Sequence, residues 1–113
     1  MRIQVKGRNG VTVDDELRAR VERKLAKVAR QVSPLAELEL ELREERNPAI
    51  KESHVAEATL HLKGVTLRAR ERSTDMRHSI NLVAEDLARQ VKKHRDKRRR
   101  RRESTKAGQP RIA

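Results

Sequence analysis

The residues best suited to chemistry are the basic ones that crowd the segment from residue 89 to residue 102. They are Arg89, Lys92, Lys93, Arg95, Lys97 and the unbroken run Arg98–Arg102. Asp96 is the single acidic residue among them, so the segment cannot neutralise itself. Guanidinium and ammonium groups bind phosphates by charge and shape, largely without reading base sequence. The segment therefore predicts a surface for a polyanion, and in a cell that indicates a nucleic acid.

A second basic set lies closer to the N-terminus, between residues 18 and 30. Its members are Arg18, Arg20, Arg23, Lys24, Lys27 and Arg30. If both segments are helices that lie side by side on one sheet face, their basic residues can form one broad surface, which would include His94. The alternative is a merely solvated face, although such faces usually mix charge signs as i, i+4 pairs. Arg8, in the turn Gly7–Gly10, could also reach a phosphate.

The sequence offers no convincing catalytic site. The four histidines, at positions 54, 61, 78 and 94, do not form a ligand pair of the H-E-x-x-H type. Adjacent acids occur at Asp14-Asp15, Glu44-Glu45 and Glu85-Asp86, where they suit a helix start, a hairpin end and a solvated face. Cysteine is absent, which excludes disulfides and thiolate metal sites. We therefore expect no enzyme activity, no metal, no cofactor and no small-molecule substrate.

The composition favours a single basic domain. The chain has 113 residues and a net charge of +12, and 41% of its residues are charged. Counting Lys and Arg against Asp and Glu, residues 1–35 carry +5, residues 36–74 carry −1 and residues 75–113 carry +8. Because there is no aromatic residue, bases cannot stack on rings as they do in RRM and OB domains. No apolar run of 18 residues and no apolar N-terminal signal occurs, so we expect a cytoplasmic location and no membrane partner.

Alternating apolar residues predict the strands that must position the basic helices. Ile3 and Val5 alternate with polar residues in a first strand, and ELELELR at residues 37–43 is the clearest strand of the chain. Residues 54–63 and 65–70 alternate in the same way and predict a hairpin that turns at Gly64. The sequence Gly7-Arg8-Asn9-Gly10 has the letters of a KH-domain loop, but it lies between a strand and a helix, so we interpret it as a turn.

Two apolar stripes predict the helices. The first stripe consists of Val13, Leu17, Val21, Leu25, Val28 and Val32. Its helix should begin near the Thr12–Asp15 start signature and end at Ser33-Pro34, because proline cannot donate the next helical hydrogen bond. The second stripe consists of Met76, Ile80, Val83, Leu87 and Val91, and Thr74-Asp75 should cap its helix.

The predicted order is β-α-β-β-β-α, an α+β fold with a four-stranded mixed sheet. A right-handed crossover makes the first two strands parallel neighbours, and two hairpins add the others. Each strand has one apolar face, so both helices should pack on that face and leave the other wet. On the wet face, Arg2 and Lys6 could lie beside the glutamates of residues 37–43. We divide the chain into a domain over residues 1–98 and a basic tail over residues 99–113, disordered or the start of a linker.

With this order and two basic helices, the chain closely resembles the ribosome hibernation-promoting factor family, which includes ribosome-associated inhibitor A. The matching pieces are IQVKGRN, VTVDDELRARVERKLAKV, ATLHLKG and DMRHSINLVAEDLARQVKKHRDK, and they cover about residues 1–98. Asp75-Met76, the run Leu87–Gln90 and Lys93-His94 before Asp96-Lys97 resemble the second-helix signature of that family. The order and spacing of these pieces carry the resemblance, since no single motif is diagnostic.

The resemblance implies a function that composition alone could not. Family members bind the small ribosomal subunit between head and body, overlap the mRNA path and the A and P tRNA sites, and hold ribosomes inactive in starvation or stress. For this chain it implies a stationary-phase translation inhibitor whose partners are 16S rRNA and the 30S subunit within the 70S ribosome. It places contacts particularly on Lys24, Lys27, Arg89, Lys93, His94 and Lys97. Long members add a C-terminal domain that dimerises ribosomes, so we expect dimerisation only if such a domain follows this one.

The sequence departs from the family where aromatic residues are common. Members often carry an aromatic residue after the Asp-Met pair, where this chain has Arg77, and others near the end of the first helix, where it has Ala29–Ser33. An arginine can lie flat on a base in place of a ring. The predicted RNA-binding set is Arg8, Arg20, Arg23, Lys24, Lys27, Arg30, Arg77, Arg89, Lys92, Lys93, His94, Lys97 and Arg98. Two alternatives stay open, a general double-stranded-RNA binder and a ribosome-associated structural or assembly protein.

Overall fold

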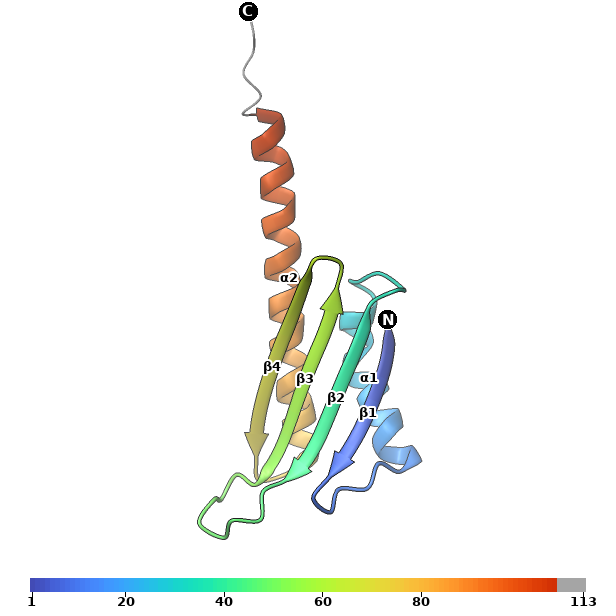
Figure 1. Cartoon of the computed structure of the whole chain (residues 1–113), viewed down its shortest axis with the longest axis vertical. Helices are drawn as coiled ribbons and strands as arrows, with labels where there is room; N and C mark the ends of the chain where they lie inside the picture. The colour runs from blue at the N-terminus through green and yellow to red at the C-terminus, as the bar shows by residue number, and fades with distance from the viewer. Residues whose placement is uncertain (108–113) are drawn as a thin grey trace, which may run out of the picture.

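Four strands form one sheet, and two helices cover one of its faces (Figure 1). The computed structural model describes residues 1–107. Its elements are β1 (Arg2–Arg8), α1 (Asp15–Ala29), β2 (Glu37–Glu44), β3 (His54–Leu62), β4 (Val65–Ser73) and α2 (Met76–Ala107). The predicted order and fold class are confirmed. Strand β4 is three residues longer than its alternation predicted, because it continues to Ser73 beside the start of β3.

The strands lie in the order β1-β2-β3-β4, with β1 parallel to β2 and the other pairs antiparallel. The parallel pair follows from the crossover through α1, and the antiparallel pairs follow from the two hairpins. Leu38, Leu40 and Leu42 are buried toward the helices. Arg2 lies opposite Glu37 and Lys6 opposite Glu41, so the predicted neighbours on the wet face are confirmed.

The turn after β1 depends on its glycines. Asn9 and Gly10 have φ values of 52° and 88°, and the Val11 N–H donates to the Arg8 carbonyl oxygen at 3.2 Å. A Cβ at Gly7 would overlap the backbone carbonyl of Val11, so this position accepts only glycine without a local shift. The segment is a strand-to-helix turn, as expected from its place in the sequence.

Helix α1 begins later and ends earlier than its apolar stripe predicted. Asp14 is the N-cap, and its Oδ1 accepts a hydrogen bond from the Leu17 N–H at 2.8 Å. A carboxylate here satisfies an unpaired helix donor and faces the positive end of the helix dipole. Arg30 is the C-cap, three residues before Ser33. Val13 and Val32, which the stripe included, therefore lie outside the helix but remain half-buried.

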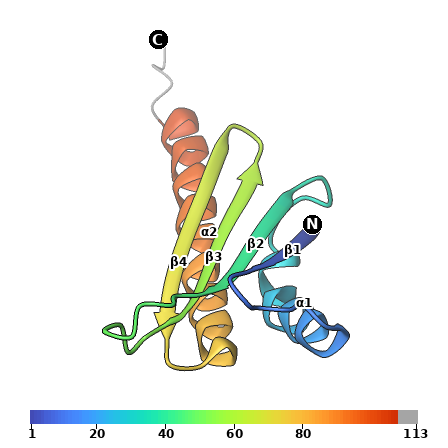
Figure 2. The ribbon, with the colours of Figure 1, turned by 60° about the horizontal axis from the view of Figure 1, so that its bottom comes forward.

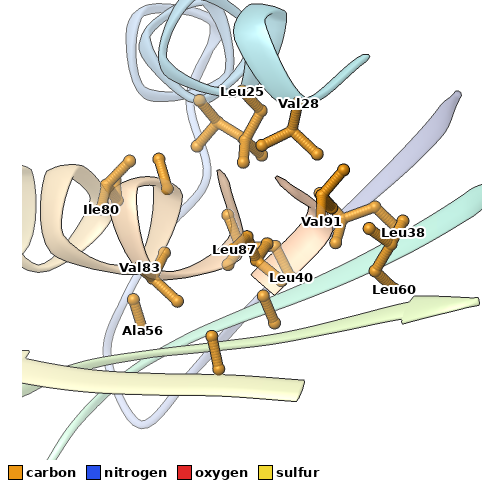
Figure 3. Close-up of a cluster of buried hydrophobic side chains, with 14 of the residues drawn as sticks. Leu25, Val28, Leu38, Leu40, Ala56, Leu60, Ile80, Val83, Leu87 and Val91 are labelled. Atoms are coloured by element: carbon orange, nitrogen blue, oxygen red, sulfur yellow. The ribbon is translucent and has the colours of Figure 1, made fainter. Parts of the chain in front are cut away.

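The core is entirely aliphatic and lies between the sheet and the two helices. Figure 3 shows Leu25 and Val28 of α1 meeting Ile80, Leu87 and Val91 of α2 above the sheet. Helix α2 packs on β3 and β4, and α1 lies beside α2 (Figures 1 and 2). Burial of these branched side chains compensates for the missing rings, because many well-packed CH₂ and CH₃ groups supply the apolar area.

Two serine hydroxyls fix the start of α2 to the sheet. The Ser79 hydroxyl donates to the His54 carbonyl oxygen at 2.6 Å and lies 2.7 Å from Ser73 Oγ. The Ser73 hydroxyl in turn lies 2.6 Å from the carbonyl oxygen of Asp75. Ser79 is completely buried, so these bonds replace the water that its hydroxyl loses on folding. They set where the helix meets the ends of β3 and β4.

Helix α2 continues well past the sheet. Val91 is the last buried residue among the α2 residues up to 101, whose side chains the structure describes, and the helix runs on to Ala107, about 24 Å beyond Val91 at about 1.5 Å per residue (Figure 1). Residues 99–107, expected to be a disordered tail or the start of a linker, are helical, and whether they begin a linker stays a prediction. Arg and Lys are good helix formers, and no glycine or proline interrupts residues 76–107. Residues 108–113 of the expected tail lie outside the described residues, and a functional boundary at residue 98 stays a prediction.

Helix α2 is long, but its composition is highly charged. Within residues 1–107, neither helix combines the length and apolar content needed to cross a membrane.

Candidate nucleic-acid interface

A groove runs between the outer surfaces of α1 and α2. It has a volume of about 400 Å³. The α1 side is lined by Lys24, Lys27 and Gln31, and the α2 side by Asn81, Ala84, Glu85, Ala88, Arg89 and Lys92. Four of the predicted RNA-binding residues, two from each helix, thus share one concave surface. We call this surface the interhelical groove.

The groove exists because side-chain size changes between the floor and the rim. Ala84 is buried and Ala88 half-buried, so α2 presents small residues where it approaches α1. Lys24, Lys27 and Arg89 are exposed at the rim. Their aliphatic stems can lie along the helices while the charged groups reach into solvent. The same helical spacing that buries the apolar stripes therefore places the cations around a hollow.

The positive charge of the interhelical groove is largely uncompensated. Glu85 is the only acidic residue in its lining, against four basic ones. Across residues 1–107, no ion pair within 4.0 Å involves Lys24, Lys27, Arg89 or Lys92. A concave surface of one sign concentrates the electrostatic potential and attracts counterions. This arrangement suits phosphate groups held at fixed positions by folded RNA.

Two buried amide oxygens add hydrogen-bonding capacity to the lining. Gln31 Oε1 and Asn81 Oδ1 are shielded from solvent and have no hydrogen-bond partner among the described residues. Buried acceptors in folded proteins nearly always meet a donor. Water, a ribose hydroxyl or a base amino group could supply one here. Sequence reasoning missed these two residues, because uncharged amides do not stand out among so many basic side chains.

A smaller hollow of about 200 Å³ lies where α1 begins, and its charges are mixed. Its lining comprises Thr12, Asp14, Glu16, Leu17, Arg20, Arg23 and Arg77. Arg77 Nη2 lies 3.6 Å from Glu16 Oε1, and Arg20 Nε is buried without a partner among the described residues. The Arg77–Glu16 pair is exposed and worth at most about 1 kcal/mol, so a phosphate could displace it. Arg77 thus lies with α1 residues, although at least 54 positions separate it from them in sequence.

The other predicted residues are dispersed. Arg30 is exposed at the end of α1, Lys93 is exposed and His94 half-buried on α2, and Lys97 and Arg98 lie on the part of α2 beyond the sheet. Arg8 lies on the opposite face of the sheet, where its Nε is 3.3 Å from Glu41 Oε2. Successive residues of a strand face opposite sides of the sheet, and Arg8 shares the outer face with Glu41, so it cannot join the helical residues. Whether each of these residues binds RNA stays a prediction.

The adjacent acids Glu85 and Asp86 have separate environments. Glu85 lines the interhelical groove, whereas Asp86 faces Glu71 on β4. Burial raises the pKa of Glu71, the nearby Asp86 carboxylate raises this pKa further, and Arg89 opposes both. Consecutive helix residues point about 100° apart, which explains why this pair does not act as one unit. Within residues 1–107, no three potential metal ligands of the His, Cys, Asp or Glu type come together.

The fold and the interhelical groove define a small α+β domain whose two sheet-bound helices present a basic surface. The chain belongs to the family described as Sigma 54 modulation protein / S30EA ribosomal protein, whose profile matches residues 3–99. The predicted family is confirmed. It is a family of ribosome-binding proteins without enzymatic activity, as expected.

Curated relatives carry the name ribosome hibernation promotion factor. The chain is 32% identical over 98 residues to the protein of Picosynechococcus sp., covering 86% of this chain and 50% of the relative. It is 35% identical over 97 residues to the Staphylococcus aureus protein, covering 84% of this chain and 48% of the relative. The chain therefore spans about half the length of the curated relatives it matches.

Solved structures share the fold. The Thermus thermophilus Protein Y N-terminal domain superposes with a TM-score of 0.70 at 26% identity, covering 83% of this chain and 99% of that domain. A ribosomal subunit interface protein from Coxiella burnetii gives a TM-score of 0.67 at 25% identity, covering 85% and 99%. Both matches extend over nearly all of the compared chain, so these structures share the whole β-α-β-β-β-α architecture.

Proposed function

We propose that this chain inhibits translation by occupying the decoding region of the small ribosomal subunit. The observation that carries the proposal is the interhelical groove, in which two helices hold four cations around one hollow against a single lining carboxylate. No bond is made or broken in this mechanism. The domain binds 16S rRNA phosphates and blocks the space through which mRNA and tRNA pass.

Rigidity makes such a block effective. Both helices are anchored by completely buried residues, such as Leu25 in α1 and Leu87 in α2, so the backbone positions that carry the rim cations are fixed relative to each other. A preorganised surface loses little conformational entropy when it binds a folded RNA of matching shape. With roughly six to eight phosphates neutralised, the slope of log affinity against log salt should be about −4 to −7.

The setting of this activity follows from the relatives. Because proteins named ribosome hibernation promotion factor are 32% and 35% identical to this chain, we assign it to ribosome hibernation in the cytoplasm during stress and stationary phase. The partner is the 30S subunit within the 70S ribosome. Promotion of ribosome dimers is proposed only for a form of the protein that carries a further C-terminal domain.

Sedimentation of the purified protein with ribosomal particles tests the proposal. We expect binding to 30S and 70S particles but not to 50S particles, with an affinity that falls steeply as KCl rises. Ribosomes loaded with mRNA and with tRNA in the A and P sites should exclude the protein. Simultaneous binding of mRNA, tRNA and the protein to one ribosome would refute the occupancy mechanism. Binding whose affinity does not change with salt concentration would also refute it.

A second candidate function is general binding of double-stranded RNA. The observation that favours it is the sheet with two helices on one face, which is also the architecture of the double-stranded-RNA-binding domain. Competition separates the two candidates. A bare RNA duplex that displaces the protein as well as free 30S subunits do would support the general binder, and a weak competitor would support the ribosomal site.

A further inference from the structure

The outer face of the sheet, opposite the helices, divides into two halves with different charge balance. On the β1–β2 half, basic and acidic residues face each other: Arg2 lies opposite Glu37 and Lys6 opposite Glu41. Arg8 also pairs with Glu41, at 3.3 Å. Including Glu39, the outer side of β2 carries three glutamates beside the three basic residues of β1. The net charge of this half is close to zero, so its charges are balanced without a bound ligand.

The β4 half lacks this compensation. Arg68, Arg70 and Arg72 alternate along the outer side of β4, and their partners on β3 are Thr59, Glu57 and Val55. Glu57, the one acidic partner, is hydrogen bonded to Arg43 of β2 at 2.9 Å. Arg43 is also the main cause that lowers the pKa of Glu57, ahead of Arg70 and Arg68. The one carboxylate directly opposite these arginines on β3 is therefore already hydrogen bonded to another arginine.

We call Arg68, Arg70 and Arg72 the β4 arginine row. Across residues 1–107, none of the three forms an ion pair within 4.0 Å, and Arg68 and Arg70 are exposed. Alternate residues of a strand lie about 6.8 Å apart, which gives the row a regular spacing. Each guanidinium can bind a phosphate through two parallel hydrogen bonds. A row of this kind suits a linear anion rather than a single small one.

The row continues toward a second concentration of arginines. Strand β4 is at the edge of the sheet, and α2 runs beside it and projects beyond the β3–β4 turn (Figures 1 and 2). The exposed residues Arg98–Arg100 lie on this projecting part. A strand of nucleic acid that follows the sheet edge can therefore pass from the β4 arginine row to the end of α2. The interhelical groove lies on the other side of the sheet.

The backbone of β4 argues against a peptide partner at this edge. Gln90 Nε2 of α2 donates to the carbonyl oxygen of Arg68 at 2.7 Å and also to Asp86 Oδ1 at 3.1 Å. An added β-strand would have to displace this side chain to use the Arg68 carbonyl group. The edge thus offers side-chain cations while one of its outward backbone groups is occupied. This combination favours a phosphodiester chain over a β-strand.

We propose that the β4 arginine row is a second nucleic-acid contact, which binds the phosphate backbone of an RNA segment other than the one in the interhelical groove. The inference deepens the proposed function and rests on it for the identity of that RNA as rRNA. Phosphate contacts on both faces of the domain fit a site between two RNA segments. They do not fit docking on a flat RNA surface.

Matched charge variants test the row. The variant R68Q/R70Q/R72Q and the control R2Q/K6Q/R46Q each remove three positive charges from outward or exposed positions. Binding to 30S subunits and to a mixed-sequence single-stranded RNA is measured by fluorescence anisotropy from 0.05 to 0.2 M KCl. The row variant should have a log–log slope shallower than wild type by about 2 to 3, and the control by less than 1.

The two proposals fail in different ways. In one outcome, the wild-type protein binds single-stranded RNA but not 30S subunits, and the row variant reduces the log–log salt slope for the single strand. This outcome would support the row and overturn the proposed function. A row variant with the wild-type slope on both RNAs overturns the row and leaves the proposed function intact. The row proposal would also be overturned if the row variant self-associated while its slope stayed unchanged. The same holds if the variant lost binding only to polyglutamate, an anion without phosphates. If the triple variant does not fold, R70Q should still reduce the slope by about 0.7 to 0.9.

Discussion

Neutralising the interhelical groove should change the salt dependence of ribosome binding more than it changes stability. The variant K24Q/K27Q/R89Q/K92Q removes the four cations of the groove lining. All four residues are exposed and without an ion-pair partner in residues 1–107, so their loss breaks no ion pair there. Glutamine has a helix propensity close to that of lysine and arginine, and the free energy of unfolding should shift by no more than about 0.5 kcal/mol.

The magnitude follows from counterion release. Each phosphate contact contributes about −0.7 to −0.9 to the log–log slope, so a fourfold rise in salt weakens a single contact roughly 2.6- to 3.5-fold. Four contacts together amount to roughly 50- to 150-fold. When KCl rises from 0.05 to 0.2 M, the affinity for 30S subunits should fall for both proteins. The fall should be roughly 50- to 150-fold larger for the wild type than for the variant.

Fluorescence anisotropy of the labelled protein with 30S subunits measures both slopes. A control variant, R2Q/K6Q/R46Q/K51Q, has the same net charge as the groove variant, but its substitutions lie on β1 and on the connection between β2 and β3. Equal slopes for the two variants would mean that net charge alone drives binding. In that case the groove has no special role, and the reasoning that places rRNA between the helices is refuted.

Three further predictions concern stability. Hydrogen bonding to Arg43 lowers the pKa of Glu57, so ionised Glu57 stabilises the fold at neutral pH, and this stability is lost as pH falls through the lowered pKa. Urea unfolding of Glu57→Gln should show a loss of at most about 1 kcal/mol at pH 7 that vanishes in acid; a loss independent of pH would contradict the ion pair. The contribution of Glu71 to stability depends on pH in the opposite direction. Burial and a neighbouring carboxylate raise the pKa of Glu71, so the folded state loses stability as pH rises from the ordinary glutamate pKa through the raised one. Glu71→Gln should therefore raise the melting temperature at pH 7 and leave it unchanged in acid, and a lower melting temperature at pH 7 would argue against this account. Gly7→Ala should cost about 1 to 3 kcal/mol, because the new methyl group overlaps the Val11 carbonyl; an unchanged thermal melt would show that the turn relaxes freely.

The element types could be predicted because they depend on local periodicity. Alternation over residues 37–43 and the stripe from Met76 to Val91 correspond directly to β2 and α2, since backbone hydrogen bonding repeats every two or 3.6 residues. The residues at which the helices begin and end were harder to predict. The helix after β1 starts at an aspartate cap, two residues later than Thr12 suggested, and α2 continues through residues 99–107 because nothing in that segment breaks a helix.

Sequence alone also determined that the chain is strongly basic, lacks aromatic rings and places its positive charge mainly in two helices, and those facts already favoured phosphate binding. Tertiary structure decided which cations lie together. Lys24 and Arg89 meet at one groove, Arg8 lies on the far face of the sheet, and the arginines of β4 are left uncompensated because Glu57 is bonded to Arg43. The physical reason is that periodicity sets the direction of a side chain relative to its own element, whereas its neighbours depend on how the elements rotate and pack against one another.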